Sequence, residues 1–171
     1  MVVVCTGPES TGKSILAKQI STYFNWCLVP EMSRAILEKS NGYYTFETID
    51  DISKCQWRAQ IETAQQCENV CCDTDLLTSI VWGEVKFKRF ETWWWNTWIN
   101  SQVDLFLLCA PDLEWEFDPL RENPHDRDML FEQYRKHLDV HSSEYKVIEG
   151  NGKERTSQAI SIIEKLLDSS Q

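Results

Sequence analysis

The chain has 171 residues, enough for one domain with a full hydrophobic core, and no apolar run approaches the length of a membrane span. Its 27 acidic and 17 basic residues give a net charge of −10, which argues against nucleic-acid binding because such binding needs cations that neutralise phosphate. We therefore expect a small-molecule ligand, held by a local group of basic side chains.

The cysteines and histidines carry no metal-binding pattern. There are seven cysteines, an odd count, with no C-x-x-C spacing. We expect them to be buried free thiols in a reducing cytoplasm, because several lie in or beside apolar runs: Cys5, Cys71, Cys72 and Cys109. The three histidines share no spacing with a metal motif, and we expect them at the surface: His125, His137 and His141.

The amino-terminal segment contains a phosphate-binding motif. An apolar run at residues 2–6 precedes Gly-Pro-Glu-Ser-Thr-Gly-Lys-Ser at 7–14, and a helical pattern follows, which is the context of a P-loop. Glycines let the backbone N–H groups point at phosphate oxygens, while Lys13 supplies positive charge and the Ser14 hydroxyl can bind Mg²⁺. The motif predicts an ATP site formed by Gly7, Glu9, Ser10, Thr11, Gly12, Lys13 and Ser14.

Strands and helices alternate along the rest of the chain. The apolar runs that predict strands lie at residues 2–6, 26–29, 70–72, 103–109 and 145–148. Helical patterns lie between and after them, at residues 13–24, 31–39, 47–67, 76–87, 90–100, 128–138 and 159–167. This alternation predicts a doubly wound α/β fold, a five-stranded parallel sheet with helices on both faces. For a P-loop domain of this kind we expect the strand order 2-3-1-4-5. We expect one domain over residues 1–171, with a lid around residues 111–135.

Acidic residues follow the second and third predicted strands. In an open parallel sheet, ligands bind beyond the carboxyl ends of the strands, so Glu31 and Asp73 are candidates for a catalytic base and a Mg²⁺ ligand. Alternatively, Glu31 could lie in the first turn of a helix, where its negative charge is favoured by the helix dipole. Asp75 could be the N-cap of the helix that follows it. Thr74 and Asp75 are further candidates for nucleotide binding.

Basic and aromatic residues follow the fourth strand. Arg121 and Arg127 lie in an irregular segment with prolines, where we expect lid arginines, although basic residues can also form a solvated helix face. Trp115 precedes them and could stack on a flat ring or simply pack.

Four of the eight tryptophans lie within residues 93–98. On a helix, most of them share one arc and should enter the core, whereas Trp93 points away and suggests a substrate wall or a partner surface. If Trp93 belongs to a partner surface, the partner could be a second copy of this chain, bound through this helix.

Several motifs together resemble the ribosylnicotinamide kinase domain of the NadR family over nearly the whole chain. They are residues 7–14, Val29-Pro-Glu31, Cys72-Asp-Thr-Asp75, Trp115, Asp118-Pro-Leu-Arg121 and residues 148–155. The resemblance implies a cytoplasmic kinase that transfers the γ-phosphate of ATP to the 5′-hydroxyl of nicotinamide riboside, giving nicotinamide mononucleotide. No His-x-Gly-His motif of an adenylyltransferase is present.

The resemblance also implies individual roles. Lys13 and Ser14 would hold ATP and Mg²⁺, and either Glu31 or Asp73 would act as the base. The other implied contacts are a ribose contact by Asp118, lid closure by Arg121 and Arg127, an adenine border at Asn151 and Arg155, and ring stacking by Trp115. Two alternatives stay open: a kinase for another nucleoside or nucleotide, and a P-loop nucleotide switch, for which the guanine-selecting Asn-Lys-x-Asp is lacking.

Overall fold

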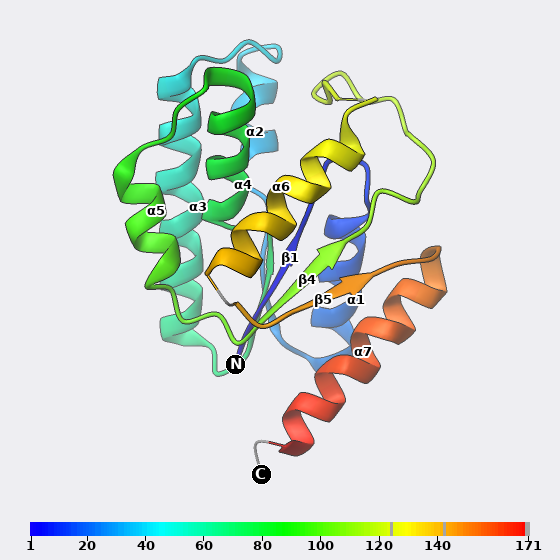
Figure 1. Ribbon diagram of the computed structural model, residues 1–171. Helices are drawn as coiled ribbons and strands as arrows, with labels where there is room; N and C mark the ends of the chain where they lie inside the picture. Colours follow the sequence, from blue (N-terminus) through cyan, green and yellow to red (C-terminus); the bar gives the residue numbers. More distant parts are fainter. Residues whose placement is uncertain (124, 142, 170–171) are drawn as a thin grey trace.

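A five-stranded parallel sheet forms the centre of the computed structural model, which describes residues 1–123, 125–141 and 143–169 (Figure 1). The strand order is β2-β3-β1-β4-β5, as predicted. The strands are β1 (Val2–Thr6), β2 (Cys27–Val29), β3 (Val70–Asp73), β4 (Leu105–Cys109) and β5 (Tyr145–Ile148). All neighbouring strands are parallel, so their carboxyl ends meet at one edge of the sheet.

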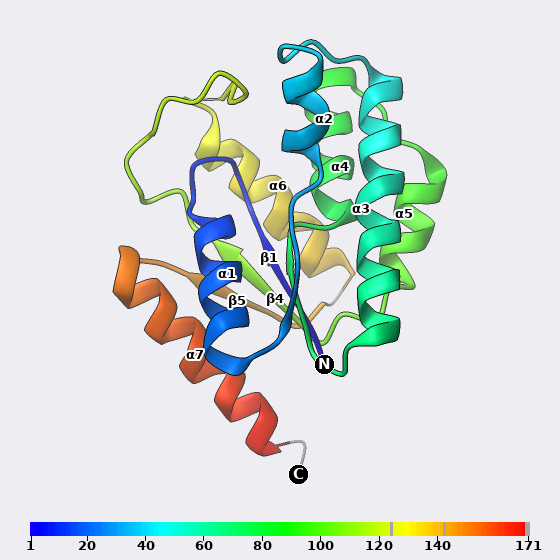
Figure 2. The ribbon, with the colours of Figure 1, turned by 180° about the vertical axis from the view of Figure 1, so that it is seen from behind.

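Helices cover both faces of the sheet (Figures 1 and 2). One face packs against α1 (Lys13–Phe24) and α7 (Gly152–Ser169), and alternate β1 residues such as Val3 contribute to that core. The opposite face, which includes Val4, packs against α3 (Phe46–Gln66), α4 (Leu76–Trp82), α5 (Thr92–Ile99) and α6 (Arg127–Val140). The apolar runs are continuous because both faces of the central strands are buried.

Two short elements differ from the predicted boundaries. The predicted helix over residues 76–87 divides into α4 and the π-helix η1 (Gly83–Phe87), which continues it. The helix α2 (Ser33–Lys39) begins two residues after Glu31, and it lies at the end of the molecule opposite to the two termini (Figure 1). Among the described residues, no helix is both long and apolar enough to cross a membrane.

The tryptophans of α5 form part of the core. Trp94 and Trp98 are buried, as the helical arc predicts. Trp93 instead donates its indole N–H to Asp50 of α3 at 2.8 Å, and Trp94 donates to the same carboxylate at 2.9 Å. Trp93 thus packs on a neighbouring helix, and its part in a partner surface stays a prediction.

The predicted surface position is wrong for His137. Its side chain is only 11% exposed, and Nε2 lies 2.7 Å from Oε2 of Glu84. The ring also packs against Trp95 and Trp98, because α6 lies across the aromatic face of α5. His125 and His141 are exposed.

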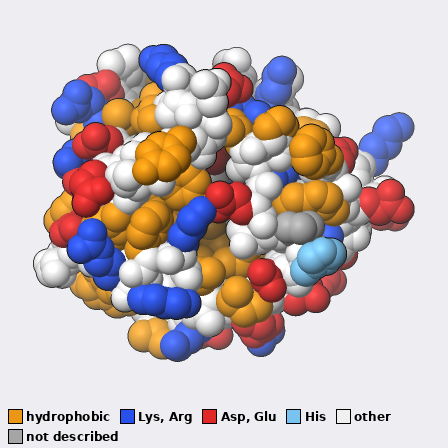
Figure 3. Space-filling model, turned by 90° about the horizontal axis from the view of Figure 1, so that it is seen from above, with side chains coloured by type: hydrophobic (Ala, Val, Ile, Leu, Met, Phe, Trp, Pro, Cys, Tyr) orange, Lys and Arg blue, Asp and Glu red, His pale blue; other side chains and the backbone are white. Residues whose placement is uncertain are grey.

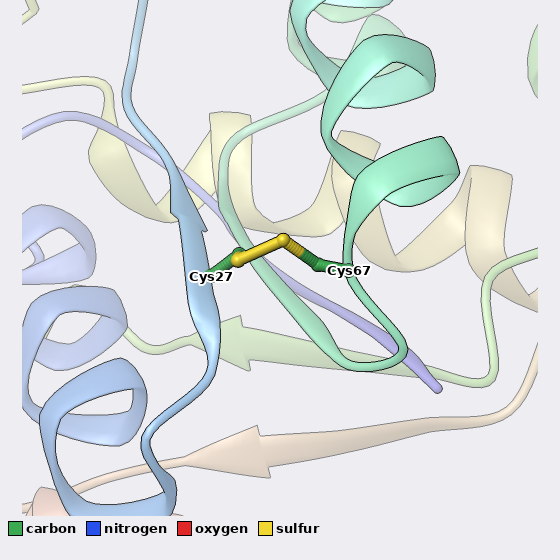
Figure 4. The surroundings of a disulfide bond; sticks show 2 residues. All are labelled: Cys27 and Cys67. Atoms are coloured by element: carbon green, nitrogen blue, oxygen red, sulfur yellow. A yellow bond between two sulfur atoms is a disulfide. The ribbon is translucent and has the colours of Figure 1, made fainter.

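The expectation that all cysteines are free thiols is wrong for Cys27 and Cys67, which form a disulfide (Figure 4). Cys27 begins β2 and Cys67 ends α3, so the bond joins an edge strand to the helix that packs on it. The sequence hides this pairing because the two residues are 40 positions apart and only the return of α3 toward the start of β2 brings them together. The other five cysteines are free, and all except Cys55 are buried.

Reduction of the disulfide should lower the free energy of unfolding by about 2–4 kcal/mol, because it returns conformational entropy to the unfolded chain. Denaturant unfolding with and without a reductant measures this difference. The double variant Cys27→Ala/Cys67→Ala is the control, since its midpoint should not respond to reductant. A wild-type midpoint that is the same under both conditions would contradict the prediction.

Candidate functional site

The P-loop connects β1 to α1 and requires glycine at two positions. Gly7 has φ +128°, and a Cβ there would lie 2.8 Å from the backbone oxygen of Cys109 at the end of β4. Gly12, at φ +76°, forms the left-handed N-cap of α1. The hydroxyl of Thr11 donates to the carbonyl of Pro8 at 2.8 Å, and the Lys13 amine donates to the same carbonyl. The loop is thus closed on itself around the amino end of α1, where anions are favoured.

A cavity of about 460 Å³ opens beside this loop. Figure 3 looks down on this end of the molecule, where the surface is hollowed between hydrophobic and charged side chains. One wall is the P-loop with the first turn of α1. The facing wall comes from Glu31, α2, α4 and η1, and includes Leu37, Tyr44, Val81, Trp82 and Lys86. The segment 113–123, here called the roof, lines the cavity with residues 113–116 and 120–123, which include Trp115 and Arg121. Leu130 and Tyr134 of α6 also line it.

The two predicted acids lie at different depths. Glu31 lines the cavity, and its carboxylate accepts a hydrogen bond from the Ser33 hydroxyl. Asp73 is 5% exposed and lies behind the cavity wall. Burial raises the pKa of the Asp73 carboxyl, and the charge of Glu31 raises it further, against hydrogen bonding from Ser14 and the charge of Lys13. These four side chains therefore form one electrostatically connected group.

The surroundings of Asp73 fit Mg²⁺. Its Oδ1 is buried without a hydrogen-bond partner among the described residues, and the Ser14 hydroxyl lies beside the same carboxylate. A carboxylate and a hydroxyl are the oxygen ligands that Mg²⁺ takes next to phosphates, with water for the rest. The described part of the chain gathers no cluster of three or more His, Cys, Asp or Glu side chains that could hold a metal. A dedicated all-protein metal cage is thus not part of the described site.

Asp75 has a structural role that the sequence offered as an alternative. It is the N-cap of α4, and its Oδ1 accepts from the backbone N–H of Leu77 at 3.2 Å. Its side chain is 4% exposed and does not line the cavity. Thr74 does line it, in the left-handed conformation at φ +70°.

The P-loop holds the roof from one side. One carboxylate oxygen of Glu9 accepts the backbone N–H groups of Glu122, at 2.9 Å, and Asn123. The hydroxyl of Ser10 accepts from the guanidinium of Arg121 at 3.3 Å, and Arg127 donates to the Ser10 carbonyl at 3.2 Å. Both predicted lid arginines therefore lie against the phosphate loop.

The facing wall holds the roof from the other side. Arg34 of α2 forms an ion pair with Asp118 at 2.7 Å, and Lys86 of η1 pairs with Glu122 at 2.6 Å. The hydroxyl of Tyr44 also donates to Glu122, at 2.5 Å. The pKa of the Asp118 carboxyl is lowered by the hydrogen bond from Leu120 and by Arg34. These contacts come from elements without a recognisable motif, which is why sequence reasoning missed them.

Besides Asp75, three predicted nucleotide-binding residues do not line the cavity: Asp118, Asn151 and Arg155. Arg155 is 3% exposed and donates to the carbonyls of Ala110 at 2.9 Å, Gly150 at 2.6 Å and Thr11 at 3.2 Å. It also pairs with Asp112, so it ties the ends of β4 and β5 to the P-loop. Asn151 is exposed in the loop after β5. Trp115 lies on the roof, and the Arg127 guanidinium is 5.8 Å from its ring centroid.

The parallel sheet with a glycine-dependent loop between β1 and α1 defines a P-loop nucleotide-binding domain. A family model described as an AAA domain matches residues 2–155, so the chain belongs to the AAA domain family. No curated protein matches the sequence.

Solved structures share the fold at low sequence identity. Two are of NadR protein, one in complex with NR (21% identity, TM-score 0.84, 96% of this chain and 50% of that chain) and one with NAD and AMP-PNP (20%, 0.80, 96% and 48%). A third is a deoxyadenosine kinase from M. mycoides with products bound (16%, 0.65, 99% and 100%). The chain thus spans about half the length of the NadR chains it matches.

The stability of the protein should depend on pH through Asp75. Burial raises the pKa of its carboxyl to about 7, against the lowering by the Leu77 hydrogen bond, whereas the unfolded value is about 4. Between these values the folded state holds a proton that the unfolded chain has lost, so the free energy of unfolding falls as pH rises from about 4 to 7.

The variant Asp75→Asn isolates this contribution, because asparagine also caps helices and does not titrate. We expect the stability of the wild type relative to this variant to decrease between pH 4 and pH 7 by roughly 1–4 kcal/mol and to change little above pH 7. Urea unfolding of both proteins at each pH gives the difference. Parallel pH curves for the two proteins would contradict the assigned pKa.

Proposed function

We propose that this protein is an ATP-dependent kinase that phosphorylates the 5′-hydroxyl of a nucleoside, with nicotinamide riboside as its acceptor. The observation that carries the proposal is the arrangement of one cavity, with the P-loop on one wall and Glu31 on the wall that faces it. Asp73 lies behind the meeting point of the two walls, next to Ser14. A phosphoryl donor and a hydroxyl acceptor can therefore meet at these acids.

The proposed reaction uses each group in a defined way. The acceptor oxygen forms a bond to the γ-phosphorus of ATP while the bond from that phosphorus to the β-bridging oxygen breaks, so ADP leaves. Glu31 orients the acceptor hydroxyl and receives its proton, because it lines the cavity whereas Asp73 does not. Asp73 and Ser14 would hold Mg²⁺, which would neutralise charge on the phosphates.

Cations on the loop and roof would stabilise the transferred group. Lys13 supplies charge at the β- and γ-phosphates, and Arg121 and Arg127 neutralise charge that develops on the moving phosphoryl group. Both arginines already contact Ser10 of the phosphate loop. The roof would also exclude water, which suits phosphoryl transfer to an alcohol.

Nicotinamide riboside is the acceptor that the family resemblance implies, and a NadR structure in complex with NR shares this fold. Trp115 on the roof offers an aromatic face, which suits the cationic nicotinamide ring. Asp118 can accept from ribose hydroxyls while it is paired with Arg34, because a carboxylate has several lone pairs. Asn151 would border the adenine, and Arg155 would act by holding that loop.

A kinase for another nucleoside is the second candidate, since a deoxyadenosine kinase also shares the fold. The test is an ADP-release assay with nicotinamide riboside, common nucleosides and their monophosphates, with the product identified by mass spectrometry. Release only with a different nucleoside would overturn the acceptor, and no release with any compound would overturn the kinase. A cytoplasmic location and self-association through α5 remain predictions.

The variant Lys13→Ala should reduce phosphoryl transfer by roughly 100-fold or more, because it removes a charge from the transferred phosphates. Among the described residues, the hydrogen bond of this side chain is to Pro8 of its own loop, so circular dichroism and the unfolding midpoint should change little. Turnover at the wild-type rate in this variant would contradict the P-loop assignment.

The variant Arg121→Ala should reduce kcat far more than it weakens ATP binding, because a lid arginine acts on the transition state. Steady-state kinetics and titration with a non-hydrolysable ATP analogue measure the two effects. Arg135→Ala is the matched control, because Arg135 is exposed on α6 and, among the described residues, its ion pair is with Glu132. Equal losses of kcat and ATP affinity would indicate a purely structural arginine.

A further inference from the structure

One buried glutamine on α3 joins the chain segments that carry the two acids. Gln56 is 3% exposed. It lies on α3, which contributes no residue to the cavity lining. Its Oε1 accepts the backbone N–H of Met32 at 2.9 Å. Its Nε2 lies 3.4 Å from the carbonyl oxygens of both Pro30 and Thr74. One orientation of the amide satisfies all three partners, since the oxygen faces a donor and the nitrogen faces two acceptors.

The partners of Gln56 are the neighbours of the acids in sequence. Pro30 and Met32 flank Glu31, so the amide fixes the peptide groups on both sides of that residue. Thr74 directly follows Asp73, so the same amide also reaches the end of β3. A single side chain therefore connects the backbone at one acid to the backbone at the other.

The segment around Glu31 has one further link to β3, because the backbone of Glu31 forms a hydrogen bond with the Asp73 carboxylate. The pairing of β2 with β3 covers only Cys27 to Val29, and β2 is the edge strand of the sheet. The end of β3 is better fixed, because the N–H of Thr74 donates to the carbonyl of Cys5 on β1 at 3.0 Å. Gln56 thus attaches a weakly held segment to a firmly held one.

We propose that Gln56 is a positioning residue that sets the separation between Glu31 and Asp73 for phosphoryl transfer; this inference rests on the proposed function. The acceptor hydroxyl must lie within about 3–3.5 Å of the phosphorus, and a displacement of about 1 Å can cost on the order of 100-fold in rate. Without the amide, the remaining hydrogen bond between the two segments runs from the Glu31 backbone to the Asp73 side chain, so the backbone at Glu31 is held less firmly relative to the backbone at Asp73. The hydrogen bonds of Gln56 to described residues go to Pro30, Met32 and Thr74 and not to the P-loop, so we expect the loop to keep its geometry.

The chain offers a matched control on the same helix. Gln60 lies one turn after Gln56 and is 5% exposed, but its Oε1 has no hydrogen-bond partner in the described part of the structure. Gln56→Met and Gln60→Met therefore make the same chemical change at two buried positions of α3. Only the first change removes bonds to the ends of β2 and β3.

The kinetic test compares these two variants with the wild type in the ADP-release assay. For Gln56→Met we expect kcat to fall roughly 10- to 100-fold, with the KM for ATP within about twofold of the wild type. Rates are expressed per folded molecule, from the native fraction in the unfolding curve. Gln60→Met should keep kcat within about twofold. Similar kcat values for all three proteins, or equal losses in the two variants, would overturn the proposal.

Hydrogen exchange supplies a measurement that does not depend on activity. The amide of Met32 donates to Gln56, so in Gln56→Met this amide should exchange at least about tenfold faster, whereas in Gln60→Met its exchange should match the wild type. Unchanged exchange at Met32 would overturn the positioning role. If the wild type phosphorylates no acceptor, the proposed function fails, and the exchange result alone decides whether Gln56 holds this segment.

A second variant covers the case in which Gln56→Met does not fold. Gln56→Glu preserves the shape and the acceptor for Met32, but replaces the amide donor that faces Pro30 and Thr74. We expect the Met32 amide to keep most of its protection and kcat to fall below that of the wild type. Wild-type kcat in Gln56→Glu would show that the link to Thr74 has no part in positioning.

Discussion

The parallel pairing of β1 with both of its neighbours is the constraint on which the site depends. Cys5 lies opposite Asp73 on β3, and Thr6 lies opposite Leu108 on β4. This register ends three strands at one edge, so the P-loop, Asp73 and the start of the roof segment emerge side by side. The close approach of Gly7 to the backbone of β4 follows from the same register, and it leaves no space for a side chain.

Basic side chains gather around the cavity, although the protein as a whole is strongly acidic. The chain has a net charge of −10, yet Lys13, Arg34, Lys86 and Arg121 all line the cavity. Lys13 donates to a neutral carbonyl, and Arg121 to a carbonyl at 2.7 Å and a hydroxyl at 3.3 Å. Phosphate oxygens are stronger acceptors than these neutral groups and can replace them. Arg34 and Lys86 are paired more closely with carboxylates, Asp118 at 2.7 Å and Glu122 at 2.6 Å, whereas the Glu116 carboxylate lies 3.9 Å from Arg121.

The sequence predicted what arises from local pattern, and it failed where distant elements meet. The succession of strands and helices and the P-loop followed from apolar runs and glycine spacing, which depend on residues close in the chain. The disulfide of Cys27 and the burial of His137 depend instead on how α3 and α6 pack. The wall formed by Tyr44 and Lys86 carries no motif either, because a loop and a π-helix supply it. Such side chains can be recognised as part of the site only once the fold is known.

The helix α3 is attached to β2 at two levels, and the two attachments have different consequences. The disulfide joins the two elements at the start of β2, far from the carboxyl edge at which ligands bind. Gln56 joins them beyond the other end of β2, next to Glu31. A cross-link acts mainly on the unfolded chain, so the first attachment contributes stability. The hydrogen bonds of Gln56 have little effect on the entropy of the unfolded chain, but they hold the backbone at Glu31 in place. Stability and site geometry thus depend on separate contacts of the same helix.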